Sequence, residues 1–373
     1  MQRCVNVIGV GMSPFSPVEL GPDPPALLGT TLVGTTIRQA LGDAGLCASN
    51  VAAVYAVTGR LASATLQRAL QHVGLAHAPL SHFPPDSADG SALLARACQD
   101  IRQGLAESIL VLGIQEAPAM PAPDQWSERV GTTARAYMAR YLTRRETFAM
   151  IAVKARRHAE LNPLAAYKGV LTMDQVLEAE VIADPLTRPQ VAWASTGVAA
   201  VLLCSGDFAA RLGNGAVVGV AAQACVSPQQ VSGLDQGSTY ADVNYEVSVA
   251  AARELYEQAG RGPQDIAVCE LHDASTVNEL LLYEALGFCP EGNAEKLVED
   301  GDNTYGGNLV VNPSGGLLTL GLSTAASALA QSIELVHQLR GSAGRRQVAD
   351  AQLALQHQTG SDGTVTTSLF QRD

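Results

Sequence analysis

The first 115 residues alternate between apolar runs typical of strands and amphipathic stretches typical of helices, and this alternation constrains the fold more than any other feature. The segment 5–11, VNVIGVG, is rich in β-branched residues and predicts a buried strand. Residues 27–46 have the apolar spacing of a helix that ends near a glycine. The same order repeats as far as the apolar run ESILVLGIQEA, 107–117. Alternation of this kind is typical of parallel strands with helices on both faces, so we predict an α/β fold.

The second half of the chain repeats this order after an interruption. Residues 116–195 are rich in Arg, Pro and polar residues, with one helix predicted around 145–162, and are typical of an excursion that covers a site. Later come a predicted strand at 265–272 between two helices, a long helix at 324–341, and two closing strands at hairpin distance. The element order therefore predicts two duplicated βαβαβ-type halves. The first comprises 1–115 and 196–230, the insertion is 116–195, and the second half is 231–373.

Composition excludes several classes of protein. Apolar residues make up 47% of the chain and charged residues 16%, so a large core can form. A net charge of −12 repels phosphate backbones and argues against binding nucleic acid. No apolar run reaches the roughly 20 residues that span a bilayer, and the N-terminus lacks a signal-peptide cleavage site. The seven Cys form no CxxC pair, which argues against a metal site and fits a reducing cytoplasm. Arg far outnumbers Lys, as in GC-rich bacterial genomes.

Four turns next to predicted strand ends lie where open α/β sheets carry their sites: 84–90, 271–276, 305–323 and 356–363. They contain parts of the runs ELHDASTVNELLLYEALGFCPEG (270–292), GDNTYGGNLVVNPSGGLLTLG (301–321) and ALQHQTGSDG (354–363). In order and spacing, these motifs resemble thiolases of the sterol-carrier-protein-x, or lipid-transfer-protein, type. The resemblance covers nearly the whole chain, although the insertion matches only in position.

This resemblance implies a thiolase fold, in which two similar halves form five layers, α-β-α-β-α, with a loop domain over the active site. It also implies a dimer and acyl-CoA chemistry. In such enzymes a Cys at the N-terminus of a buried helix attacks a thioester, because the helix dipole lowers the pKa of the thiol. A His activates that Cys, and oxyanion holes hold the developing charge.

Three positions depart from the family pattern. Ser87 in DSADGSALL stands where the family has its nucleophilic Cys, and Leu322 in GLSTAASA stands where it has the activating His. Ala274 replaces the Cys of the HDCF motif. A serine hydroxyl is a far poorer nucleophile than a thiolate, and leucine cannot transfer a proton. We therefore do not expect ordinary thiolase activity.

The polar residues that remain in the family motifs are the candidate site residues. The catalytic candidates are His272, His357, Ser87 and Tyr305, and the substrate-binding candidates are Asn312, Asn278, Gly315 and Gly316. Each also has a plain structural interpretation: Ser87 as a helix cap, the two His as structural residues, and Tyr305 and Asn312 as turn residues. We expect His272, His357 and Asn312 to meet in one pocket beside the N-terminus of the helix predicted at 88–105.

Two functions of different classes follow. The first is an enzyme of bacterial lipid metabolism that handles acyl-CoA by aldolase or acyl-transfer chemistry, with coenzyme A as part of the substrate and no covalently bound cofactor. Acyl transfer through Ser87 ranks below the aldolase, since Leu322 removes the obvious base. The alternative is a catalytically inactive subunit that docks on a true thiolase or on an OB-fold and zinc-ribbon partner. In either case we expect a homodimer or heteromer, because the edge strand PLSHFP is apolar.

Overall fold

The computed structural model of the 373-residue chain describes residues 3–17, 29–59, 61–83, 89–116, 125–213, 217–234, 240–323 and 325–372. Its strands are β1 (Val5–Met12), β2 (Ser16–Pro17), β3 (Ala53–Thr58), β4 (Leu80–Phe83), β5 (Ser108–Gln115), β6 (Val181–Ala183), β7 (Leu186–Thr187), β8 (Ser195–Ser205), β9 (Val218–Val226), β10 (Val268–Glu270), β11 (Val310–Val311), β12 (Leu353–Thr359) and β13 (Val365–Arg372). Its helices are α1 (Thr30–Asp43), α2 (Ser63–His72), α3 (Gly90–Arg102), α4 (Gln125–Tyr141), α5 (Arg145–Ala159), α6 (Met173–Leu177), α7 (Gly206–Leu212), α8 (Tyr245–Ala259), α9 (Thr276–Ala285), α10 (Ala294–Glu299), α11 (Leu317–Leu320) and α12 (Ser327–Arg340).

One large sheet runs through the described part of the molecule in the order β11-β10-β12-β13-β9-β1-β8-β5-β3-β4. Its two halves meet where Asn6 and Val7 of β1 pair with Gly219 and Val218 of β9. The parallel pairs are those of β3 with β4 and β5, and of β10 with β11 and β12. The pairs that involve β1, β8, β9 and β13 are antiparallel, so the sheet is mixed rather than wholly parallel as the alternation alone indicated.

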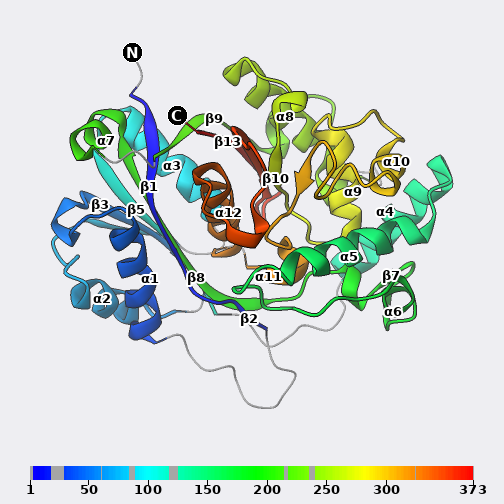
Figure 1. Cartoon of the computed structure of the whole chain (residues 1–373), viewed down its shortest axis with the longest axis horizontal. Helices are drawn as coiled ribbons and strands as arrows, with labels where there is room; N and C mark the ends of the chain where they lie inside the picture. Colours follow the sequence, from blue (N-terminus) through cyan, green and yellow to red (C-terminus); the bar gives the residue numbers. More distant parts are fainter. Residues whose placement is uncertain are drawn as a thin grey trace.

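The layers are those of a thiolase fold. Helices α3 and α12 lie between the two halves of the sheet, where Leu94 and Leu329 share one core with Val201 and Ala354 (Figure 1). The outer helices α1 and α2 cover the N-terminal half, and α8 and α9 cover the C-terminal half. The close approach of α12 requires a glycine on β5, because a Cβ on Gly113 would lie 2.0 Å from the carbonyl oxygen of Ala325. The five-layered prediction is confirmed.

The segment between β5 and β8 carries α4, α5 and α6 and the small β6–β7 pair. The sequence analysis predicted α5 but missed α4. Helix α5 packs against α9 and α10, and α4 packs against α9, next to the C-terminal half of the sheet (Figure 1). The division at residues 115, 195 and 230 stays a prediction.

Candidate functional site

A cavity of about 440 Å³ opens beside the ends of β10 and β12. Its walls come from α4, the turn before α8, the turn between β10 and α9, the first turn of α9, the segment just after α11, and the end of β12 with the loop that follows it. The lining residues are Trp126, Arg129, Ala241, Asp242, Asn244, His272, Ala274, Asn278, Leu322, Thr359, Gly360, Ser361 and Gly363.

Hydrogen bonds on both sides of His272 fix the turn that presents it. The backbone N–H of Leu271 donates to Oδ1 of Asn312 at 2.7 Å, and the carbonyl oxygen of Leu271 accepts from Nε2 of Gln331 at 2.6 Å. The carboxylate of Asp273 accepts from the backbone N–H of Leu317 at 2.7 Å. The backbone around His272 is therefore held by segments that lie 40 or more residues away in sequence.

Glycine is required next to this turn. Gly316 has a φ of 65°, and a Cβ there would lie 2.1 Å from Oδ2 of Asp273. At Gly315, with a φ of 98°, a Cβ would lie 2.1 Å from Oγ1 of Thr319. Both glycines thus permit a close approach of backbone to side chain rather than forming the cavity wall.

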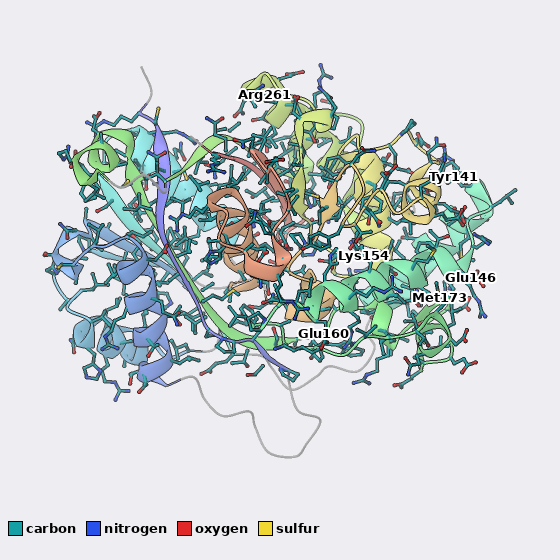
Figure 2. The ribbon with its side chains drawn as sticks, in the orientation of Figure 1. Tyr141, Glu146, Lys154, Glu160, Met173 and Arg261 are labelled. Carbon is teal, nitrogen blue, oxygen red and sulfur yellow. The ribbon has the colours of Figure 1, made fainter. Side chains whose placement is uncertain are left out.

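A buried polar network is hydrogen-bonded to the residues that hold this turn. Glu279 pairs with Lys154 and also accepts hydrogen bonds from Tyr283 and, at 3.0 Å, from Nδ2 of Asn312. His158, four residues along α5 from Lys154, places Nδ1 2.8 Å from the carbonyl oxygen of Asn312. Lys154 lies on the inner side of α5, whereas Glu146 of the same helix lies at the periphery (Figure 2). Helix α5 is therefore joined to the turn by Lys154, through Glu279, and by His158, through Asn312.

The two candidate histidines lie close together and are both neutral at pH 7. His272 is partly exposed to the cavity, and burial lowers its pKa to about 4 although the neighbouring Gln358 side chain opposes the shift. His357 is fully buried, and burial together with the positive charge of protonated His272 lowers its pKa to about 3. Nε2 of His357 lies 2.9 Å from Oγ of Ser248.

Several polar atoms at the ends of β10 and β12 have no hydrogen-bond partner among the described residues. They are Nδ1 of His272, Nδ1 of His357 and both amide atoms of Gln358. Buried polar groups are seldom left unpaired. Of these three residues His272 lines the cavity, so its Nδ1 is the atom that a ligand there can satisfy. Leu322 and Ala274 add apolar surface to the lining of the cavity. The arrangement suits a ligand with both a polar and an apolar part.

The structure brings only some of the predicted site residues to the cavity. His272 and Asn278 line it, and His357 lies behind His272. Asn312 is fully buried and does not line the cavity, because both ends of its amide bond to Leu271 and Glu279. The expected meeting of both His residues with Asn312 in one pocket is therefore only partly found.

The other candidates lie elsewhere. The hydroxyl of Tyr305 donates to the carbonyl oxygen of Arg346 at 2.7 Å, and its ring packs edge-on against His158, away from the cavity. Gly315 and Gly316 also lie off the wall. Ser87 falls in 84–88, outside the described residues. Near it, Asp89 caps α3 by accepting from the N–H groups of Ser91 and Ala92, and a Cβ on Gly360 of the cavity wall would lie 3.0 Å from its carboxylate.

The mouth of the cavity was not predicted from the sequence. Trp126 and Arg129 come from α4, and Nε of Arg129 lies 2.6 Å from Oδ1 of Asp242 in the turn before α8. No family motif marks these residues, and the only available signal was the polar, Arg-rich composition of the insertion.

The described segments contain no group of three or more His, Cys, Asp or Glu side chains arranged to hold a metal ion. Among their helices, none is long and apolar enough to cross a membrane.

The chain is similar to known proteins over its whole length. Residues 232–370 match the family model "Thiolase C-terminal domain-like". Sterol carrier protein 2 of Gallus gallus is 37% identical over 99% of this chain and 72% of that protein. Benzoylsuccinyl-CoA thiolase subunit BbsB of Thauera aromatica is 31% identical over 96% of this chain and 95% of that subunit.

Among solved structures, the Ltp2-ChsH2(DUF35) aldolase superposes with a TM-score of 0.80 at 22% identity. The match covers 99% of this chain and 98% of that chain. At this level of identity the likeness establishes the shared fold.

Proposed function

Because the chain belongs to the thiolase superfamily, to its sterol-carrier-protein-x or lipid-transfer type, we propose that it cleaves a carbon–carbon bond of an acyl-CoA thioester without forming a covalent acyl-enzyme. The observation that carries this proposal is the pair of neutral histidines with unpaired Nδ1 atoms beside a cavity that no cysteine of the described residues lines. Proton transfer and carbonyl polarisation need such groups, whereas thiolysis needs a thiol.

The departures from the family pattern support this chemistry. Leu322 and Ala274 both line the cavity, so the positions where the family resemblance places a proton acceptor and a thiol are apolar here. Coenzyme A enters as part of the substrate, with no covalently bound cofactor, and BbsB is by name a thiolase subunit for a CoA thioester. The solved neighbour is by name an aldolase, which supports cleavage rather than thiolysis.

The proposed reaction is a retro-aldol cleavage of a 3-hydroxyacyl-CoA. A base accepts the proton of the β-hydroxyl group, the bond between Cα and Cβ breaks, and Cβ becomes a ketone or aldehyde. The electron pair of that bond moves into the thioester enolate, which then takes a proton at Cα. The atoms balance without an oxidant, a reductant or a second substrate.

His272 lines the cavity and is assigned the proton transfers with the substrate, whereas His357 lies buried behind it and is assigned a supporting role. A neutral imidazole offers one N–H donor and one lone pair. His272 faces the cavity, so its N–H is placed to polarise the thioester oxygen where the enolate charge develops. His357 supplies the second unpaired Nδ1, and the hydrogen bond to Ser248 fixes its ring. Asn278 also lines the cavity and is assigned to substrate binding.

The test is to incubate the protein with a panel of 3-hydroxyacyl-CoAs of different chain length and branching, and to follow the products by liquid chromatography and mass spectrometry. We expect a shortened acyl-CoA and a carbonyl product in equal amounts, with no increase in protein mass. His272→Gln should lower turnover about 10²- to 10⁴-fold. His77→Gln, at an exposed position far from the cavity, serves as the matched control. A stable acyl adduct on Ser87 would contradict the aldolase proposal and would instead indicate an acyltransferase.

Names of relatives favour a second function. BbsB is named as a subunit, and the solved neighbour is named as a complex of Ltp2 with ChsH2(DUF35). The alternative is therefore a non-catalytic subunit of a heteromer with a true thiolase or an OB-fold and zinc-ribbon partner. This alternative predicts that the isolated chain turns over none of the thioesters in the panel. It also predicts that any turnover by a reconstituted complex is the same with wild-type protein and with His272→Gln.

A further inference from the structure

A second cavity lies at the other end of α3 from the candidate site. It has a volume of about 770 Å³ and is bordered by the starts of β1 and β9, the ends of α3 and α8, and helix α7. Helix α3 spans 13 residues, so its C-terminal Arg102 lies about 20 Å from the N-terminal cap at Asp89. The two cavities share no lining residue.

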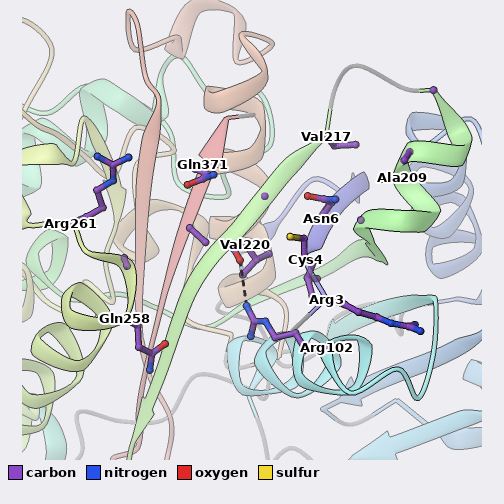
Figure 3. A pocket seen from close by; sticks show the side chains of 17 residues that line it. Arg3, Cys4, Asn6, Arg102, Ala209, Val217, Val220, Gln258, Arg261 and Gln371 are labelled. Atoms are coloured by element: carbon purple, nitrogen blue, oxygen red, sulfur yellow. Dashed lines mark hydrogen bonds between the residues drawn. The ribbon is translucent and has the colours of Figure 1, made fainter. Parts of the chain in front are cut away.

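The charge of this cavity is opposite to that of the chain. Its lining includes Arg3, Arg102 and Arg261 and, among the described residues, no Asp or Glu, in a protein of net charge −12. Figure 3 shows Arg102 reaching from α3 to β9, with Arg3 and Arg261 on opposite sides of the cavity. Amide side chains, among them Asn6 and Gln371, supply further hydrogen-bonding groups.

Arg102 is the central group. Its side chain is half-buried, and it donates to the carbonyl oxygen of Val220 at 3.3 Å and to Oε1 of Gln223 at 3.2 Å. Both acceptors are neutral, so they orient the guanidinium without neutralising it. Arg102 stands in the last turn of α3, where the negative end of the helix dipole partly balances its charge, but none of the carboxylates in the described residues pairs with it. A fixed guanidinium in a hollow, without a carboxylate partner, is an arrangement that can bind a phosphate group.

We infer that this cavity binds a ligand carrying a diphosphate group, held by Arg102 and flanked by Arg3 and Arg261. More than one negative charge is needed to engage arginines on both sides of the cavity, and its volume exceeds that of a single phosphate. The diphosphate is either inorganic pyrophosphate or part of a nucleoside diphosphate. The inference is independent of the proposed function, because it rests on none of the residues of the candidate active site.

Isothermal titration calorimetry with pyrophosphate and with ADP tests the inference. Wild-type protein should bind at least one of them, and affinity should fall as sodium chloride rises from about 50 to 300 mM. Equal affinities would identify the inorganic anion as sufficient, and tighter binding of ADP would show that the nucleoside contributes. Arg102→Gln should weaken binding about tenfold or more, because hydrogen bonds to charged groups are strong.

Two controls separate this site from others. Arg253→Gln removes an exposed arginine of α8 that pairs with Glu257 and does not line the cavity, so it should leave the affinity unchanged. Trp126→Ala alters the candidate active site and should also leave it unchanged. If Arg102→Gln unfolds the protein, the double variant Arg3→Gln/Arg261→Gln takes its place. No binding of either ligand at millimolar concentration, or binding that none of the cavity variants weakens, overturns the inference.

Discussion

The side-chain oxygen of Asn312 accepts a hydrogen bond from the backbone N–H of Leu271 at 2.7 Å, across 41 residues of sequence. The nitrogen of the same amide donates to Glu279, and Asn312 itself has a φ of 53°, a conformation that Asn tolerates better than most residues. Asn312 therefore joins the turn that carries His272 to the buried pair of Glu279 and Lys154. Both ends of its amide are thus engaged in holding the turn.

Asn312→Ala should lower the free energy of unfolding by about 2–4 kcal/mol, because it leaves the Leu271 N–H and part of the Glu279 carboxylate unpaired in the interior. Denaturation by urea measures the change. Asn308→Ala is the matched control, since Asn308 is exposed and its amide bonds to Asp302 at 3.3 Å. Equal effects at the two positions would contradict the positioning role.

Lys154→Met should destabilise the protein by about 3–5 kcal/mol, because it leaves the charge of Glu279 buried without its partner. Replacing both residues, as Lys154→Met/Glu279→Leu, should recover part of that loss. Lys296→Met removes an exposed lysine that pairs with Asp300 and should leave stability nearly unchanged, because water screens such a pair. A double variant less stable than Lys154→Met would show that hydrogen bonds of Glu279, rather than its charge, dominate.

Stability should fall as the pH drops from about 6.5 towards 4, in part because His357 stays neutral when folded. Its folded pKa of about 3 lies below the value of about 6.5 in an unfolded chain, so the unfolded state binds the extra proton first. Each such histidine contributes a slope of about 1.4 kcal/mol per pH unit in that window. His357→Gln should flatten the profile, while His77→Gln should not. The free energy of unfolding is measured at pH 7.5 and at pH 5 for the wild type, His357→Gln and His77→Gln. The contribution of buried carboxylates is common to all three proteins, so it cancels when their pH dependences are compared.

The protein should show no thiolysis of acetoacetyl-CoA, against turnover on the order of 10 per second for an ordinary enzyme. Ser87→Cys alone should not restore it, since Leu322 offers no proton acceptor. Ser87→Cys/Leu322→His should recover more activity than either single change, because members of one catalytic unit depend on each other. Rescue by Ser87→Cys alone would reveal another base, with His357 the first candidate.

The protein should sediment as a dimer or in a larger assembly. Strand β4 is the terminal strand of the sheet and pairs on one side with β3, so its other edge can pair with a second chain. His82→Lys places a charge on that edge and should shift the equilibrium towards monomer, whereas His77→Lys should not. Analytical ultracentrifugation at micromolar concentration measures the oligomeric state of the three proteins. A monomeric wild type would exclude self-association through β4.

Local sequence patterns determined most of the elements. The strands β1 and β5 and the helices α3 and α12 were predicted within a few residues, because such patterns depend on neighbours one to four positions away. The resemblance of the motifs to a known family then indicated how these elements are arranged in the fold. Helix α4 was not predicted, because the insertion is rich in Arg and polar residues and was interpreted as irregular outside 145–162.

Tertiary structure decided which motif residues reach the cavity. The strand predicted at 265–272 ends at Glu270, because the N–H of Leu271 bonds to Asn312 instead of to a neighbouring strand. Tyr305 and Asn312 stand in turns that sequence places near the site, yet long-range hydrogen bonds direct both away from the cavity. Trp126 and Arg129 reach it from a helix without a motif. A local pattern specifies the element that a residue occupies, whereas the direction of its side chain depends on partners that only the folded chain brings together.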